Sequence, residues 1–294
     1  MIQDFKCTYG NLAGICESVT NRTNLMFPDA YKHAETMAEL AQVLRECNEA
    51  PFCELPFCHT VEAEAMGGII NYGNEKTGPR AKEYLCTDIE EILELPAIDF
   101  EKGRIQEVLK ACRILYEKGE HVVFEVSGPL TILNVLIDPK YVFKGMRKKP
   151  ELMARIFAKL GKEILAYMKL AKEQGADFIS YADSSGGVNI LGPKMAEQMV
   201  DLFTYDFVKQ AGKLADEHTM ILLCPKTTFA LLGTGKAKLI DCQIHDDRSQ
   251  EEDSLSYAEA CIQMKGKIRF AGQMCIKNLD YRIKNGIMKE VHIL

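Results

Sequence analysis

From about residue 50 to its end, the sequence alternates short apolar runs with longer amphipathic segments. In the clearest cycle, apolar residues recur at helical spacing over 150–172, and the apolar run DFISY follows at 177–181. Helical patterns at 105–118 and 195–218 are likewise followed by HVVFEV at 121–126 and TMILL at 219–223. Strands that alternate with helices pair in parallel, and strands that are apolar along their whole length are covered on both faces.

Further short runs predict strands at 52–58, 238–244, 268–271 and 291–294, which makes about seven or eight units in all. That number favours a closed (β/α)8 TIM barrel over an open doubly wound sheet. No Gly-x-Gly-x-x-Gly follows the early strands, which weakens the dinucleotide-binding alternative. We therefore predict a single barrel domain over residues 1–294, with residues 1–50 as an N-terminal cap.

The composition limits the partners and the location. The net charge is -6, without a dense basic face, which argues against nucleic acid as a partner. No apolar run approaches the ~20 residues that span a bilayer, and the N-terminus has no signal-peptide pattern, so we expect a cytoplasmic protein without a membrane partner. The 11 cysteines are an odd number, which does not suit a disulfide framework. The sequence leaves a homodimer open.

In a barrel, the functional side chains lie on the loops that follow the carboxyl ends of the strands. This rule selects candidate residues without any motif. They are Ser127 after the strand 121–126, Asp183, Ser184 and Gly186 after 177–181, Cys224 after 219–223, His245 after 238–244, and Gln273 and Cys275 after 268–271.

Asp183, Cys224, His245 and Cys275 follow four different strands and would meet at the barrel mouth. Their oxygen, sulfur and nitrogen donors suit zinc, and a catalytic zinc site needs only three protein ligands. A single cysteine near a strand end is more often structural, and His245 borders a charged loop. We therefore predict a functional role for at least two of the four acting together.

Six segments, in this order, resemble landmarks of the uroporphyrinogen decarboxylase superfamily. They are PFCHTVEAEAMGG (56–68), GPRAKEYL (78–85), VSGPLTIL (126–133), GADFISYADSSGG (175–187), LLCPKTTFALL (222–232) and IRFAGQMCIKNL (268–279). The resemblance implies an α/β barrel. It also nominates His59 and Glu64, together with Ser127, Ser184, Gly186 and Gln273, as substrate- or cofactor-binding residues.

Within the superfamily, the chain resembles the corrinoid-dependent methyltransferases. The Arg-rich N-terminal segment of the decarboxylases has no counterpart, since residues 1–55 contain only Arg22 and Arg45. The segment VEAEAMGG looks like the methylcobalamin:coenzyme M methyltransferases and the related O-demethylases of anaerobes, which use zinc near a corrinoid. The His-x-Cys zinc motif of the coenzyme M enzymes reads Leu222-Leu223-Cys224 here, so only its cysteine carries over.

The resemblance therefore implies an O-demethylase-type methyltransferase. It would pass a methyl group from a methoxylated, aromatic small-molecule donor to the Co(I) corrinoid of a partner protein, because no Asp-x-His-x-x-Gly cobalamin motif is present. Zinc or a positioned acid would stabilise the leaving oxygen. Cys224 and Cys275 would bind zinc, and Asp183 or His245 would complete the site and act in catalysis. The alternatives are a methylcobamide:thiol methyltransferase, a decarboxylating lyase and a non-catalytic binding barrel.

Overall fold

The computed structural model describes residues 2–7, 14–244 and 255–294 of the chain. The strands are β1 (Cys53–Leu55), β2 (Ile69–Asn71), β3 (Arg80–Glu83), β4 (Val122–Ser127), β5 (Phe178–Ala182), β6 (Met220–Leu223), β7 (Ala237–Gln243), β8 (Phe270–Ala271) and β9 (Ile287–Ile293). The longer helices are α2 (Ala34–Cys47), α5 (Gly103–Glu117), α6 (Pro129–Leu136), α7 (Pro139–Lys148), α8 (Pro150–Glu173), α12 (Pro225–Gly233) and α13 (Tyr257–Met264).

The shorter helices lie mainly in the connections between these elements. They are α1 (Glu17–Thr20), η1 (Asp29–Tyr31), α3 (Val61–Ala65), α4 (Glu91–Glu94), η2 (Ser184–Gly186), α9 (Val188–Leu191), α10 (Pro193–Met199), η3 (Val200–Thr204), α11 (Tyr205–Ala211) and η4 (Gly212–Leu214). Among the described residues, no helix is both long enough and apolar enough to cross a membrane.

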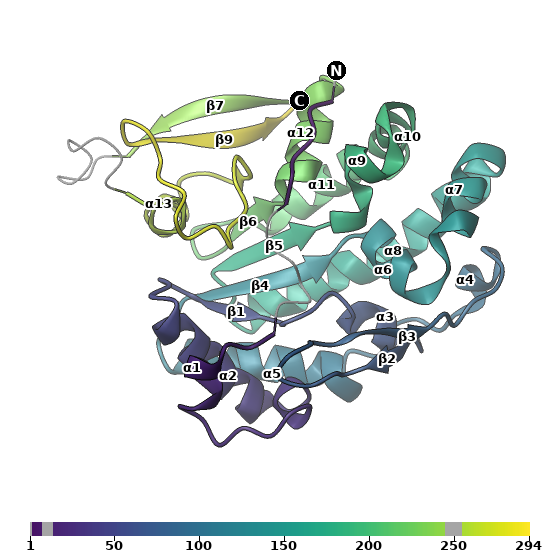
Figure 1. The fold of residues 1–294 in the computed structure, drawn as a ribbon. Helices are drawn as coiled ribbons and strands as arrows, with labels where there is room; N and C mark the ends of the chain where they lie inside the picture. The colour runs from purple at the N-terminus through teal and green to yellow at the C-terminus, as the bar shows by residue number, and fades with distance from the viewer. Residues whose placement is uncertain (1, 8–13, 245–254) are drawn as a thin grey trace.

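A seven-stranded sheet forms the centre of the fold, in the order β1-β4-β5-β6-β8-β9-β7. The first five strands pair in parallel, as predicted. Every residue of β4, β5 and β6 is buried, which is expected for strands covered on both faces. Helix α8 packs on β4 and β5, and α2 packs outside β1 beside α5 (Figure 1).

Two of the predicted strands differ from the expectation of parallel pairing throughout. The runs at 238–244 and 291–294 form β7 and β9, which pair antiparallel over their whole length. In the described part of the chain, β1 and β7 are the two ends of the sheet, and no strand pairing joins them into a ring. The reason lies in the connection from β8 to β9, which contains no helix, and strands joined without a crossover helix pair antiparallel. The single-domain organisation with residues 1–50 as a cap stays a prediction.

The predicted helices begin and end where backbone chemistry requires. Helix α8 starts at Pro150 and stops before Gly175, whose φ of 97° only glycine adopts readily. The helix predicted at 195–218 ends earlier, because the Asp216 side chain accepts hydrogen bonds from the backbone N–H groups of His218 and Thr219. Such local bonds compete with a continuing helix.

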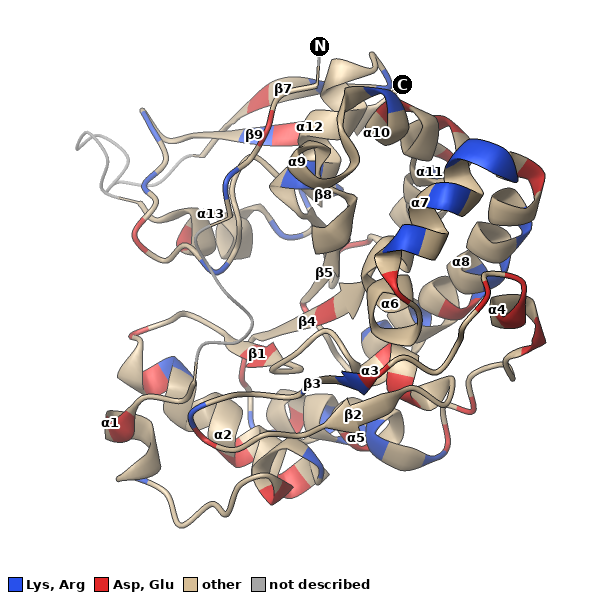
Figure 2. Cartoon of the chain, turned by 45° about the vertical axis from the view of Figure 1, so that its right-hand side comes forward, with Lys and Arg blue, Asp and Glu red and all other residues tan. Residues whose placement is uncertain are grey.

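The charged residues are distributed over the outside of the molecule. Figure 2 shows Asp and Glu interspersed with Lys and Arg, and it shows a group of basic residues on α7.

Candidate active site

A small pocket lies towards the carboxyl ends of the parallel strands, where barrel enzymes carry their active sites. Its volume is ≈70 Å³. We call it the mouth pocket. Its polar lining residues include His59 after β1, Glu125 of β4, Ser184 after β5, Cys224 after β6, and Cys275 and Lys277 after β8. Two larger hollows, of ≈440 and ≈710 Å³, lie beside the amino ends of β6 and β8 and between α5 and α8, away from this edge.

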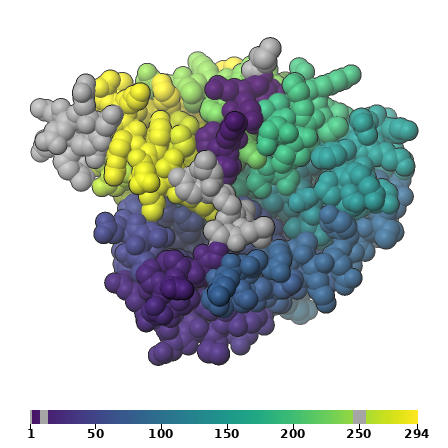
Figure 3. Space-filling view, viewed as in Figure 1, coloured from purple at the N-terminus to yellow at the C-terminus, as the bar shows by residue number. Residues whose placement is uncertain are grey.

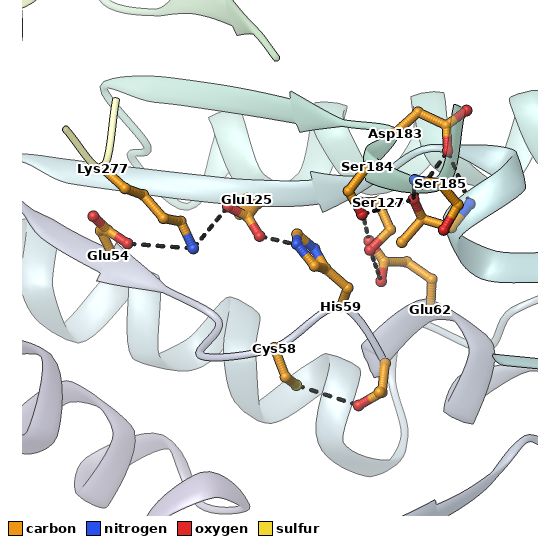
Figure 4. Close-up of polar contacts among 12 residues, drawn as sticks. Glu54, Cys58, His59, Glu62, Glu125, Ser127, Asp183, Ser184, Ser185 and Lys277 are labelled. Atoms are coloured by element: carbon orange, nitrogen blue, oxygen red, sulfur yellow. Dashed lines mark hydrogen bonds and ion pairs between the residues drawn. The ribbon is translucent and has the colours of Figure 1, made fainter. Parts of the chain in front are cut away.

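Four buried or half-buried charged groups form an ion array at the mouth pocket (Figure 4). His59 Nδ1 lies 2.8 Å from Glu125 Oε1, and Lys277 Nζ lies 3.0 Å from Glu125 Oε2. The same Nζ lies 3.6 Å from Glu54 Oε2. Each carboxylate oxygen of Glu125 therefore faces a different basic side chain.

The contacts within the ion array shift the pKa values of its carboxyl and amino groups. Burial alone would raise the pKa of Glu125, but His59 and Lys277 lower it to about 2. Burial opposes the charge on Lys277, yet Glu125 and then Glu54 outweigh it and raise the pKa of Lys277. Glu54, which has only the more distant lysine contact, has its pKa raised by burial. Glu125 is thus an anion and Lys277 a cation at neutral pH.

Asp183 lies beside the mouth pocket but does not line it. Its Oδ1 accepts hydrogen bonds from Thr131, at 2.8 Å from the backbone N–H and 3.0 Å from the hydroxyl. Burial raises the pKa of Asp183 to about 6, against the lowering effect of those bonds. A Cβ at Gly128 would lie 2.3 Å from Asp183 Cβ, so only glycine allows this approach. Gly186 is the other close neighbour of this carboxyl group.

The structure brings together two of the predicted zinc ligands. Cys224 and Cys275 both line the mouth pocket, and burial raises the pKa of Cys224 to about 11 and that of Cys275 to about 12. His245 lies outside the described residues. Among the residues that are described, no group of three His, Cys, Asp or Glu side chains lies close enough to hold a metal ion. The donor chemistry therefore fits zinc only in part.

A third cysteine, Cys7, reaches the mouth pocket and was not predicted. Residues 2–7 lie along α12, where the Phe5 and Phe229 rings are 6.0 Å apart and Ile2 packs on Gly233. Figure 3 shows this N-terminal segment, in purple, lying against the green part of the surface. The sequence offered no signal for Cys7, because it precedes all the predicted elements.

The remaining predicted residues have different neighbours. His59 and Ser184 line the mouth pocket. Ser127 donates its backbone N–H and its hydroxyl to the Glu62 carboxylate at 2.6 and 3.1 Å, which fastens α3 to the end of β4. Glu64 pairs with the buried Arg104, whose guanidinium also donates to Cys58 and Thr60.

Gln273 also has a structural contact. Its Oε1 accepts the backbone N–H of Lys289 at 2.6 Å and so ties the segment after β8 to β9. Glu64 and Gln273 do not line the mouth pocket. Sequence reasoning missed Glu125 and Lys277, although a glutamate inside the apolar run HVVFEV was a usable signal, because a buried carboxylate needs a charged partner.

Comparison with known proteins gives a consistent result. The family model described as uroporphyrinogen decarboxylase (URO-D) matches residues 12–273. Two methylcobamide:CoM methyltransferases of Methanosarcina barkeri are 29% and 27% identical over 264 residues, which is 89% of this chain and 75% of each relative. A uroporphyrinogen decarboxylase of Myxococcus xanthus is 26% identical over 178 residues, 56% of this chain and 49% of that protein.

Among solved structures, a methyltransferase from Methanosarcina mazei matches with a TM-score of 0.64 at 24% identity. The match covers 77% of this chain and 66% of that chain, and it bears on the fold alone. Together with the family match, it confirms the predicted barrel type. The predicted superfamily and its methyltransferase branch are confirmed as well.

Proposed function

The chain belongs to the uroporphyrinogen decarboxylase family, and on this basis we propose that it is a corrinoid-dependent methyltransferase. The reaction would move a methyl group from a methoxylated, aromatic small molecule to the Co(I) corrinoid of a partner protein. The observation that carries the proposal is the mouth pocket, where a histidine held by an ion array shares an enclosed space with apolar walls. The names of the methylcobamide-dependent relatives support the corrinoid.

The proposed reaction requires a group that stabilises the leaving oxygen. When Co(I) attacks an ether methyl group, the C–O electron pair passes to the oxygen, and an alkoxide or phenoxide is a poor leaving group. A group that stabilises this oxygen lowers the barrier. Leu222, Leu223, Pro225, Met274 and Ile276 give the pocket apolar walls, which suit the apolar part of a small donor.

The acceptor requirement is testable with free cob(I)alamin in place of the unidentified partner protein. With a panel of methoxyarenes under anaerobic conditions, we expect phenol to form only when cob(I)alamin is present, together with an equal amount of methylcobalamin. Absorbance of the cobalamin and chromatography of the phenol measure both products. Phenol formation at the same rate in cobalt-free reactions would refute the proposal.

A thiol acceptor is the second candidate, because the curated relatives are named methylcobamide:CoM methyltransferases. Leu222 lines the pocket at the position where the coenzyme M enzymes carry the zinc-binding histidine, and leucine cannot bind a metal. We therefore rank the methoxyarene donor first. Demethylation of methylcobalamin by coenzyme M, faster than any methoxyarene reaction, would reverse this order.

We also propose that Cys224 and Cys275 bind zinc, which would act as a Lewis acid when bound. Two thiolates favour zinc over magnesium or calcium, and a third ligand, Asp183 or His245 as predicted, must complete the site. For protein purified anaerobically, we expect about one zinc per chain in the wild type and a loss of most of it in Cys224→Ser and Cys275→Ser.

Elemental analysis measures this prediction directly. Cys261→Ser is a matched control, because Cys261 is a buried cysteine of α13 outside the mouth pocket. Equal zinc in all four proteins, or none in the wild type after purification in zinc-supplemented buffer, would rule out the site.

A further inference from the structure

The ion array has a geometry that neither a packing role nor the proposed zinc site explains. Glu125 lies inside β4, with its side chain only 8% exposed, among strand residues that are otherwise apolar or small. Burying a charge there costs free energy unless partners compensate for it. His59 and Lys277 are those partners, and they come from segments after β1 and after β8, at two different places on the sheet.

The histidine is oriented by this arrangement. Its Nδ1 faces Glu125 at 2.8 Å, and Figure 4 shows the imidazole between Glu125 and Ser127. Among the described residues, Nδ1 approaches Glu125 at an ion-pair distance without forming a hydrogen bond, and Nε2 has neither an ion-pair nor a hydrogen-bond partner. Because His59 lines the mouth pocket, Nε2 is the ring nitrogen left to meet a bound molecule.

The ring has an acidic neighbour on one side and an apolar pocket on the other. His59 Nδ1 lies 2.8 Å from Glu125 Oε1, and Leu222, Leu223 and Ile276 line the pocket together with His59. An imidazole in this position can pass a proton to a bound molecule, and a proton donor acts most strongly where water is excluded.

We propose that His59 is the general acid of the methyl transfer and that Glu125 and Lys277 are its positioning residues; this inference rests on the proposed function. As the Co–C bond forms, the C–O bond breaks and its electron pair remains on the substrate oxygen. The proton on His59 Nε2 passes to that oxygen, so the product leaves as a neutral phenol. His59 is left neutral and takes a proton from water before the next turnover.

The role of the positioning residues follows from the contacts. Glu125 holds the Nδ1 side of the ring and so fixes which nitrogen faces the pocket. Lys277 occupies the second oxygen of Glu125 and keeps that carboxylate ionised. Asp183 does not replace His59 in this role, because its Oδ1 is engaged by Thr131 and it does not line the pocket.

The test compares methyl donors that differ in how much they need a proton. An unactivated methoxyarene releases a basic phenoxide, 4-nitroanisole releases a weakly basic one, and an S-methylsulfonium donor releases a neutral sulfide. With cob(I)alamin as acceptor, we expect His59→Gln to slow the unactivated donor by about 10²- to 10⁴-fold. The loss should shrink for 4-nitroanisole and nearly vanish for the sulfonium donor.

Glu125→Gln is expected to slow the three donors in the same order as His59→Gln but by smaller factors, because glutamine occupies the same place without the charge. His121→Gln is the matched control, because His121 forms a similar pair with Asp177 at 3.2 Å outside the pocket. It should leave all three rates unchanged. The sulfonium rate also reports whether each variant is folded.

The outcomes separate this inference from the proposed function. If the wild type transfers methyl from none of the donors to cob(I)alamin, the proposed function fails. If the wild type is active and His59→Gln loses the same factor on every donor, or loses nothing, His59 is not the acid and the inference is overturned.

Discussion

Replacing Glu125 with alanine is expected to lower the free energy of unfolding by about 3–5 kcal/mol, the usual cost of removing one partner of a buried ion pair. The variant leaves Lys277 with only Glu54 at 3.6 Å, and it leaves His59 Nδ1 without its anion. Methyl transfer should fall as well, because the ring loses its orientation. Chemical denaturation of wild type and variant measures the stability change.

Two further variants make this result specific to the buried array. Lys277→Met combined with Glu125→Ala should recover part of the stability, because the double variant no longer buries a lysine without its main partner. Glu90→Ala removes an ion pair with Lys149 that is 48% exposed on both sides, and should cost at most about 1 kcal/mol. Equal losses for Glu125→Ala and Glu90→Ala would contradict the account of the ion array.

Replacing Asp183 with asparagine is expected to stabilise the protein at pH 8 and to have little effect below pH 4. Burial raises the pKa of this carboxyl group from its ordinary value of 3.8 to about 6, so the folded state holds the proton more tightly than the unfolded state. The stability that Asp183 contributes is therefore present at low pH and is lost as the pH rises through the window between these two values. The difference of about two pH units corresponds to roughly 3 kcal/mol as an upper bound.

Unfolding curves of both proteins between pH 4 and pH 8 measure this prediction. Asparagine can still accept the two bonds from Thr131, so the comparison isolates the charge. Asp138→Asn should show the opposite sign, because Lys140 contacts lower the pKa of Asp138 and the variant loses stability at high pH. A difference between Asp183→Asn and the wild type that does not change with pH would refute the account.

Much of the central sheet could be predicted from local pattern. The strands β4, β5 and β6 and the helices α5 and α8 lie within a few residues of their predicted positions, because apolar periodicity and helix-ending glycines are local signals. The hairpin of β2 and β3 and the antiparallel pairing of β7 with β9 were not predicted. Pairing direction depends on the partner strand, and a single run of residues carries no record of that partner.

The site residues likewise divide into those that could be predicted from the sequence and those that could not. The rule that function follows strand ends located Ser184, Cys224 and Cys275, which line the mouth pocket. It could not locate Glu125, which lies within a strand, or its pairing with Lys277 far along the chain. The contact between Glu125 and Lys277 depends on how the sheet folds. The sequence showed only that a glutamate lies inside an apolar strand.

The most direct measurement of the central claim follows the methyl carbon itself. A methoxyarene carrying a ¹³C-labelled methyl group would be incubated anaerobically with the wild-type protein and cob(I)alamin, and the cobalt-bound methyl group would be examined by NMR. We predict that the label appears as ¹³C-methylcobalamin in an amount equal to the phenol released, and that His59→Gln slows its appearance. Phenol without labelled methylcobalamin, or label that reaches cobalt equally fast without the protein, would contradict it.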